Sequence, residues 1–173
     1  MGAVIAMSQL VKGPRMQQEA LAPDDRTRMV SRHSLAYILC AISELFRHYD
    51  FDPLDLLIIH AVLNGNVINV MRDEALDRQF AGLDTVEPDA IKQGVSRAAL
   101  SRFLNLPLET VRRRADRLRK LGILADGADG LIVTEKNAHR FGNNHHLQTN
   151  NMALVRKLLR DLQRCGIHGP EDV

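Results

Sequence analysis

Aromatic side chains are scarce in this chain, which has no Trp, two Tyr and five Phe among 173 residues. A core without large rings must be built from aliphatic side chains, and a composition that is 45% hydrophobic supplies enough of them. Leu, Ile and Val packed between helices would form such a core. The length predicts one compact domain, with or without a mobile end.

Cysteine is also rare, and long apolar runs are missing. The two cysteines, Cys40 and Cys165, both lie in apolar helical patterns, so no disulfide framework is expected and the chain has the composition of a reduced cytoplasmic protein. The apolar residues 3–7 are too few for a signal-peptide core, and no run is long enough to cross a membrane. We therefore expect a cytoplasmic protein without a membrane anchor.

Motifs of catalysis are absent as well. The sequence contains no Gly-rich phosphate loop, no nucleophile elbow and no pair of carboxylates that the helical pattern would place on one face of a pocket, which argues against an enzyme and against a cofactor. His139, His145, His146 and Cys165 raise the question of a metal sensor. Their spacing disfavours it, because adjacent histidines point in different directions on a helix and no C-x-x-C or H-x-x-x-H pair occurs.

The most organised stretch is residues 96–124, SRAALSRFLNLPLETVRRRADRLRKLGIL. Ser96 is a good N-cap for a short helix, and Asn105 follows where the chain must turn sharply, a place that favours a residue tolerant of the left-handed conformation. Pro107 then opens a second helix, which Gly122 ends. The helical period predicts buried faces made of Ala99, Leu100, Phe103 and Leu104 in the first helix and Val111, Ala115, Leu118 and Leu121 in the second.

Two short apolar runs follow the second helix. Residues 123–125 and 131–134 flank the turn DGADG, a pattern that predicts a β-hairpin. Two helices, a tight turn and a hairpin resemble the winged helix-turn-helix of transcription regulators. TVRRRADRLRKLGIL is most similar to the MarR family, whose second helix carries T-V, D-R-L and a glycine with two apolar residues in this order, and the IclR and GntR families are near alternatives. The resemblance covers Gly94 to Lys136.

The resemblance implies a mainly α protein with a small β-hairpin wing, in which a winged helix-turn-helix is flanked by N-terminal and C-terminal helices. It also implies a homodimer that binds double-stranded DNA and regulates transcription, with the helix Pro107–Leu121 in the major groove. MarR-like proteins often bind an aromatic effector between the dimer helices and the winged domain, but no residue in this sequence marks such a pocket. Whether an effector exists, and which operator is read, stay open.

Charge supports the DNA-binding prediction. Residues 97–120 hold eight basic and two acidic side chains, a net charge of +6, whereas the whole chain carries +2. A basic segment on an otherwise acidic chain is typical of a nucleic-acid binder. The alternative is a winged helix used as a protein-interaction or assembly module, in which the arginines meet an acidic partner.

The helical period also separates three consecutive arginines. With Val111 pointing inward, Arg113 lies on the opposite face with Glu109, Asp116 and Lys120, and Arg114 borders the protein. We expect Arg113 to bind guanine, with Arg112 as a second reader and Arg117 on the DNA backbone. The predicted DNA-binding residues are Ser96, Arg97, Arg102, Leu108, Glu109, Thr110, Arg112, Arg113 and Arg117. The wing turn has no basic residue, so Asp126 should repel phosphate.

The flanking segments have simpler patterns. Residues 1–26 are predicted to be a mobile arm. Residues 27–93 should hold a helix from Thr27 that is apolar over most of its circumference and a second helix that Asp52 caps, that begins at Pro53 and that stops at Gly65. A long connection with one short helix near residues 72–80 should follow. Residues 135–144 should hold one irregular turn. A terminal amphipathic helix within 145–168 either closes the core or pairs with the N-terminal helix of a second subunit.

Overall fold

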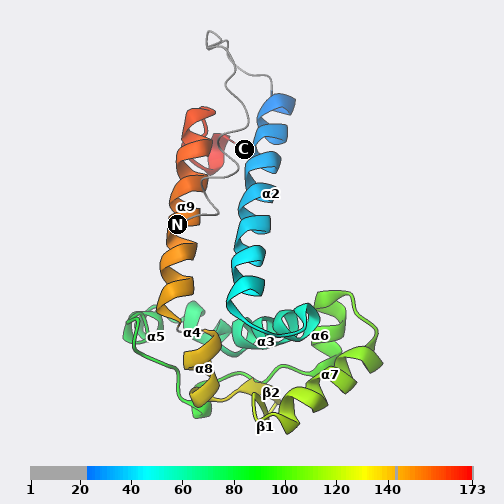
Figure 1. Cartoon of the computed structure of the whole chain (residues 1–173). Coiled ribbons are helices and arrows are strands. Elements are labelled where there is room, and N and C mark those ends of the chain that lie inside the picture. Colours follow the sequence, from blue (N-terminus) through cyan, green and yellow to red (C-terminus); the bar gives the residue numbers. More distant parts are fainter. Residues whose placement is uncertain (1–22, 143, 173) are drawn as a thin grey trace.

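Figure 1 shows the computed structural model of the chain, which describes residues 23–142 and 144–172. This part is mainly helical with one two-stranded antiparallel sheet, as the sequence predicts. Two long helices, α2 (Pro23–His48) and α9 (His145–Arg164), lie side by side and stand clear of a base made by the elements between them in the chain. Helix α2 begins one turn before the predicted Thr27, and the rest of the predicted arm lies outside the described residues.

The base contains short helices and the hairpin. In chain order they are α3 (Pro53–Asn66), α4 (Ile68–Arg72), α5 (Glu74–Gln79), the 3₁₀ turn η1 (Asp89–Ile91), α6 (Arg97–Leu104), α7 (Leu108–Lys120), β1 (Leu124–Gly127), β2 (Gly130–Val133) and α8 (Glu135–Phe141). A 3₁₀ turn, η2 (Pro170–Asp172), follows α9. The strands pair from Leu124 with Val133 to Gly127 with Gly130, so the predicted hairpin is confirmed.

Helix α3 is the centre of the base. Asp52 caps it by accepting a hydrogen bond from the Leu54 amide at 2.9 Å, and Pro53 is its first residue, both as predicted. The predicted stop at Gly65 is wrong, because the helix continues to Asn66. A Cβ at position 65 would lie 2.5 Å from Val95 Cγ2, so the glycine permits a close approach of Val95 rather than ending the helix.

The core is mainly aliphatic, as predicted, with Tyr49 and Phe141 as its buried aromatic members. It joins the inner face of α3 to α6, α7 and the hairpin through fully buried residues that include Leu56, Ile59, Val62, Leu100, Val111, Leu118, Leu131 and Val133. Burial of such side chains, worth about 1.5–3 kcal/mol each, makes the base the main source of stability.

The connection between α3 and α6 differs from the prediction. It holds two helices where one was expected over 72–80, because Asp73 interrupts the helix and caps α5 through hydrogen bonds from the amides of Ala75 and Leu76. Its last residues are attached to the hairpin. The buried Lys92 ammonium donates to Asp89 at 2.6 Å and to the carbonyl of Val133 at 2.8 Å.

Asn66 fastens the same junction from the side of α3. Its buried amide nitrogen donates to the carbonyls of Gln93 and Leu131, at 2.7 and 3.2 Å, and its oxygen accepts from the Val133 amide at 2.9 Å. With these bonds, α3 fixes the position of the hairpin relative to the helices. Nothing in the local sequence pattern distinguishes this asparagine from one that ends a helix.

After the hairpin, residues 135–141 form the helix α8 rather than the predicted single irregular turn. Helix α9 then packs on α2 of the same chain, where the Tyr37 hydroxyl donates to Asn151 at 3.0 Å. A second stripe of α2, formed by Leu35, Ile38 and Leu39, stays exposed. The apolar breadth predicted for this helix is therefore covered by the described part of the chain on one side only.

Candidate nucleic-acid interface

Helices α6 and α7 are joined by the tight turn that the sequence predicts. The Ser96 hydroxyl accepts a hydrogen bond from the Ala99 amide at 3.1 Å, and Asn105 adopts the left-handed conformation with φ 51°. Pro107 immediately precedes the first helical residue of α7. Gly122 follows the helix with φ +69°, a conformation that side chains disfavour.

Two residues assigned to the buried faces lie on the surface instead. Phe103 is 74% exposed, because Leu100 and Leu104 face the core and Phe103 falls at the edge of that face. Leu121 is 56% exposed, since α7 ends at Lys120 and the chain turns away. The remaining inward residues of α7, Val111, Ala115 and Leu118, are fully buried as predicted.

The rotation predicted for α7 is confirmed. Glu109, Arg113, Asp116 and Lys120 are all exposed on the face opposite Val111. Arg102, Arg113 and Lys120 have no ion pair with any residue that the structure describes. They are thus the basic side chains with the greatest freedom to meet an external anion.

Arg114 points toward the protein, as the period predicts, and binds two aspartates at the start of α3. Its Nη1 lies 2.7 Å from Asp52 Oδ1 and 2.8 Å from Asp55 Oδ1, and the Asp55 side chain is fully buried. Asp55, then Asp52, raises the pKa of Arg114. The pKa of Asp52 is lowered chiefly by the hydrogen bond from the Leu54 amide, with Arg114 acting in the same direction and burial opposing the shift. The cluster ties α7 to α3.

Arg117 is also connected to this cluster, although it was predicted to contact the DNA backbone. Its Nη1 lies 3.2 Å from Asp55 Oδ2, but without hydrogen-bond geometry, and its side chain is 61% exposed. The contact leaves the guanidinium accessible from solvent.

The other flank of α7 faces the start of α6 and the hairpin. Arg97 Nη2 lies 3.2 Å from Asp116 Oδ1 and 3.7 Å from Asp126 Oδ1, and Arg119 pairs with the same two aspartates. The wing turn has no basic residue of its own, but the charge of Asp126 is compensated by these two arginines from α6 and α7.

The structure brings most of the predicted site residues to one surface. Arg97, Arg102, Glu109, Arg112 and Arg113 reach it from α6 and α7, and Arg112 Nη1 lies 3.6 Å from Glu109 Oε2. Ser96 lies there too, with its oxygen engaged as a cap. Leu108 and Thr110 are half-buried at the start of α7. The prediction left out Lys120, although the helical period placed it opposite Val111.

The internal pairs lower the charge that this surface presents. The segment 97–120 carries +6 by itself, but Asp52, Asp55 and Asp126 come from outside it and pair with its arginines, which leaves +3. Sequence counting could not anticipate this, since the three carboxylates are distant from α7 in the chain or were assigned to turns and caps.

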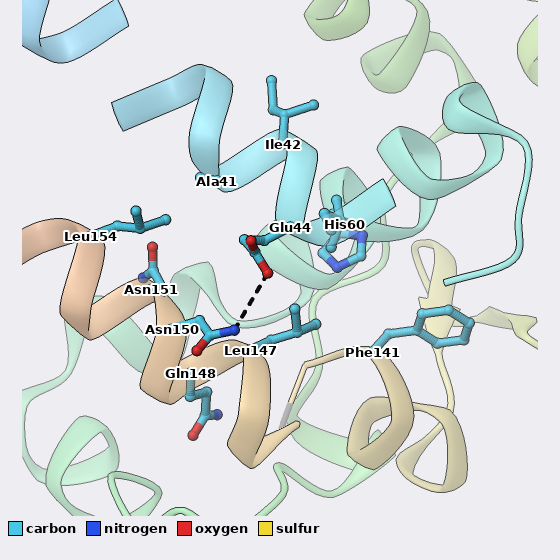
Figure 2. A pocket seen from close by; sticks show the side chains of 11 residues that line it. Ala41, Ile42, Glu44, His60, Phe141, Leu147, Gln148, Asn150, Asn151 and Leu154 are labelled. Carbon is cyan, nitrogen blue, oxygen red and sulfur yellow. Dashed lines mark hydrogen bonds between the residues drawn. The ribbon is translucent and has the colours of Figure 1, made fainter. Parts of the chain in front are cut away.

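A cavity of about 330 Å³ lies where α2 and α9 meet the base, although no residue in the sequence marks it. Figure 2 shows its lining, with Glu44 from α2, His60 from α3, Phe141 from α8 and Asn150 from α9. Burial lowers the pKa of His60, and hydrogen bonds to the Leu56 and Phe141 backbone oppose the shift. The buried Gln148 Oε1 at its edge has no hydrogen-bond partner within the described residues.

The described residues contain no group of three or more His, Cys, Asp or Glu that could hold a metal ion. Their helices include none that is both long and apolar enough to cross a membrane. Comparison of the chain with known protein families, curated proteins and solved structures found no match. A functional proposal therefore depends on the geometry of α7 and its surroundings.

Proposed function

We propose that the protein is a sequence-specific regulator that binds double-stranded DNA, in which residues 94–136 form a winged helix-turn-helix and α7 enters the major groove. The observation that carries the proposal is the outer face of α7, where Arg113 and Lys120 are exposed and have no carboxylate partner in the described part of the chain. Arginine is the side chain that most often contacts guanine in the major groove of DNA.

The order of elements supports the winged helix. Val95, just before α6, forms an antiparallel bridge with Leu131 of β2, with hydrogen bonds of 2.9 Å in both directions. The chain order is therefore that of a winged helix: a bridging residue, then two helices joined by a tight turn, then a β-hairpin. The arrangement leaves α7 with one face on the core and the opposite face in solvent, as reading a groove requires.

The proposal is tested by retention of sheared genomic DNA from the source organism on the purified protein, followed by sequencing. We expect a common sequence among the retained fragments. Arg113→Ala should weaken binding to it by about 1–3 kcal/mol, since a bidentate base contact is lost. Arg160→Ala on α9 is the matched control, because it removes the same charge from an exposed position far from α7. Equal losses for both variants would contradict the proposal.

We propose further that the DNA-binding form is a homodimer joined through α2 and α9. Leu35, Ile38 and Leu39 are 56%, 47% and 57% exposed, and Met152 and Leu159 of α9 are 50% and 54% exposed. Exposed apolar patches often mark protein–protein interaction sites. A DNA site with two-fold symmetry is bound by two recognition helices, one from each subunit of a dimer. Light scattering should give twice the monomer mass of 19.4 kDa. Leu39→Glu should halve it, whereas Met71→Glu, at an exposed apolar residue of α4, should not.

One observation favours a different class, a protein-interaction or assembly module. Phe103 is 74% exposed on α6, next to the basic surface, and an exposed aromatic ring is more typical of protein interfaces than of phosphate contacts. In that case Phe103→Ala would abolish capture of an acidic partner protein. For a DNA-binding regulator, the same variant should leave operator binding within about twofold, because non-contact surface changes act weakly.

The cavity of Figure 2 is where the MarR resemblance would put an effector. Its mostly apolar lining and its few polar groups, among them Glu44 and Gln148, are typical of small-molecule sites. Thermal shift of the protein with a panel of small aromatic acids and bases, repeated with Ala41→Trp to fill the space, tests this part of the proposal. Shifts that survive Ala41→Trp would contradict it.

A further inference from the structure

Four charged side chains form a closed network on the hairpin side of α7. Arg97 comes from the first turn of α6, Asp116 and Arg119 from α7, and Asp126 from β1. Each arginine contacts both carboxylates, at 3.2 and 3.7 Å for Arg97 and at 3.5 Å for Arg119 to Asp116, with a closer contact from Arg119 to Asp126.

The network is exposed, which limits what it does for stability. The side chains of Asp116 and Asp126 are 52% and 49% exposed, and those of Arg119 and Arg97 are 40% and 28% exposed. Ion pairs at such positions contribute about 0–1 kcal/mol each. Two aspartates beside the proposed DNA-binding face therefore carry an electrostatic disadvantage for DNA binding without a compensating gain in stability.

We propose that Asp116 and Asp126 are specificity-determining residues that occupy Arg97 and Arg119 in place of DNA phosphates. The inference rests on the proposed function. A carboxylate and a phosphate bind the same edge of a guanidinium, so the two compete. The aspartates thus withdraw two positive charges per subunit from contacts that are independent of sequence.

The loss of these two positive charges weakens non-specific DNA binding more than sequence-specific DNA binding. Non-specific binding depends almost entirely on phosphate contacts. A specific complex also has base contacts, for which Arg113 on the outer face of α7 is the proposed donor, and so it depends less on Arg97 and Arg119. The network raises the ratio of specific to non-specific affinity.

The test compares Asp126→Asn with Asp129→Asn. Both remove one negative charge from the hairpin, but Asp129 is exposed at the turn and has no ion pair in the described part of the chain. Affinity for a random-sequence duplex is measured by fluorescence anisotropy between 50 and 200 mM salt. Asp126→Asn should steepen the salt dependence by about two phosphate contacts per dimer, which is about a tenfold larger loss of affinity over this range. Asp129→Asn should leave the slope unchanged.

Two further variants make the result specific to the network. Asp116→Asn should act in the same direction as Asp126→Asn, and adding Arg119→Ala to Asp126→Asn should return the slope to that of the wild type. Equal behaviour of the Asp126 and Asp129 variants would overturn the inference while leaving the proposed function intact. Failure of the wild type to bind any duplex would overturn both.

Discussion

The two flanks of α7 hold their arginines with carboxylates of opposite accessibility. On the α3 side, Arg114 and Arg117 both contact Asp55, whose side chain is fully buried, and Arg114 also contacts the 40% exposed Asp52. On the hairpin side, Arg97 and Arg119 meet Asp116 and Asp126, which are about half exposed.

The difference in accessibility separates ion pairs that must stay formed from ion pairs that can rearrange. A buried carboxylate that loses its cationic partner destabilises the folded state strongly. The ion pairs of Asp55 on the α3 flank must therefore stay formed, and they fix the rotation of α7. An exposed pair can break at little cost, so the arginines of the hairpin flank are available to exchange partners. The same residue types thus hold the helix in place on one side and tune its charge on the other.

The largest expected effect of breaking this arrangement comes from Asp55→Ala. It should lower the free energy of unfolding by about 3 kcal/mol, at the low end for breaking a buried ion pair, because Asp52 still contacts Arg114. The melting temperature should fall by about 6–12 °C. Asp50→Ala, at an exposed residue outside the cluster, is the control in the same melting experiment. An unchanged melting temperature for Asp55→Ala would show that the buried contact does not hold α7.

Arg114→Ala and Arg113→Ala test the rotation of α7. Arg114→Ala should cost about 3 kcal/mol of stability, as much as Asp55→Ala, because the buried Asp55 carboxylate then keeps only the contact with Arg117, which lacks hydrogen-bond geometry. Arg113→Ala should leave thermal stability unchanged and weaken operator binding. Exchange of these two effects between the variants would mean that the assigned DNA-contact residues are wrong.

Asp126→Asn should change the free energy of unfolding by less than about 1 kcal/mol, in contrast to Asp55→Ala. The chemical denaturation that measures both variants compares the flanks directly. A loss for Asp126→Asn as large as that for Asp55→Ala would remove the distinction between them.

Acid pH gives the smallest expected effect. The pKa of Asp52 is lowered in the folded protein, so its contribution to stability is full above its unfolded pKa of about 3.9 and is lost as the pH falls through the lower folded value. Wild-type protein should therefore lose slightly more stability than Asp52→Asn between pH 5 and pH 3. Parallel pH profiles of the melting temperature would contradict this account of Asp52.

Much of this arrangement follows from the sequence, and the reason is local. The caps at Asp52 and Ser96, the left-handed Asn105 and the inward stripe of α7 are set by neighbouring residues, so the helical period alone predicted that Arg114 faces the protein. The partners of the arginines could not be predicted, because Asp55 and Asp126 meet α7 only after the chain folds. Gly65 misled for the same reason, since its role is set by Val95, 30 residues away.

The salt dependence of DNA affinity tests the central claim most directly. If the proposed dimer neutralises about five phosphates, the slope of the logarithm of affinity against the logarithm of salt should lie near −4 to −5, at about −0.9 per phosphate. Anisotropy titrations of the full chain with a duplex between 50 and 200 mM salt measure it. A slope in this range supports binding through the α7 face, and a flat response would remove DNA from the account.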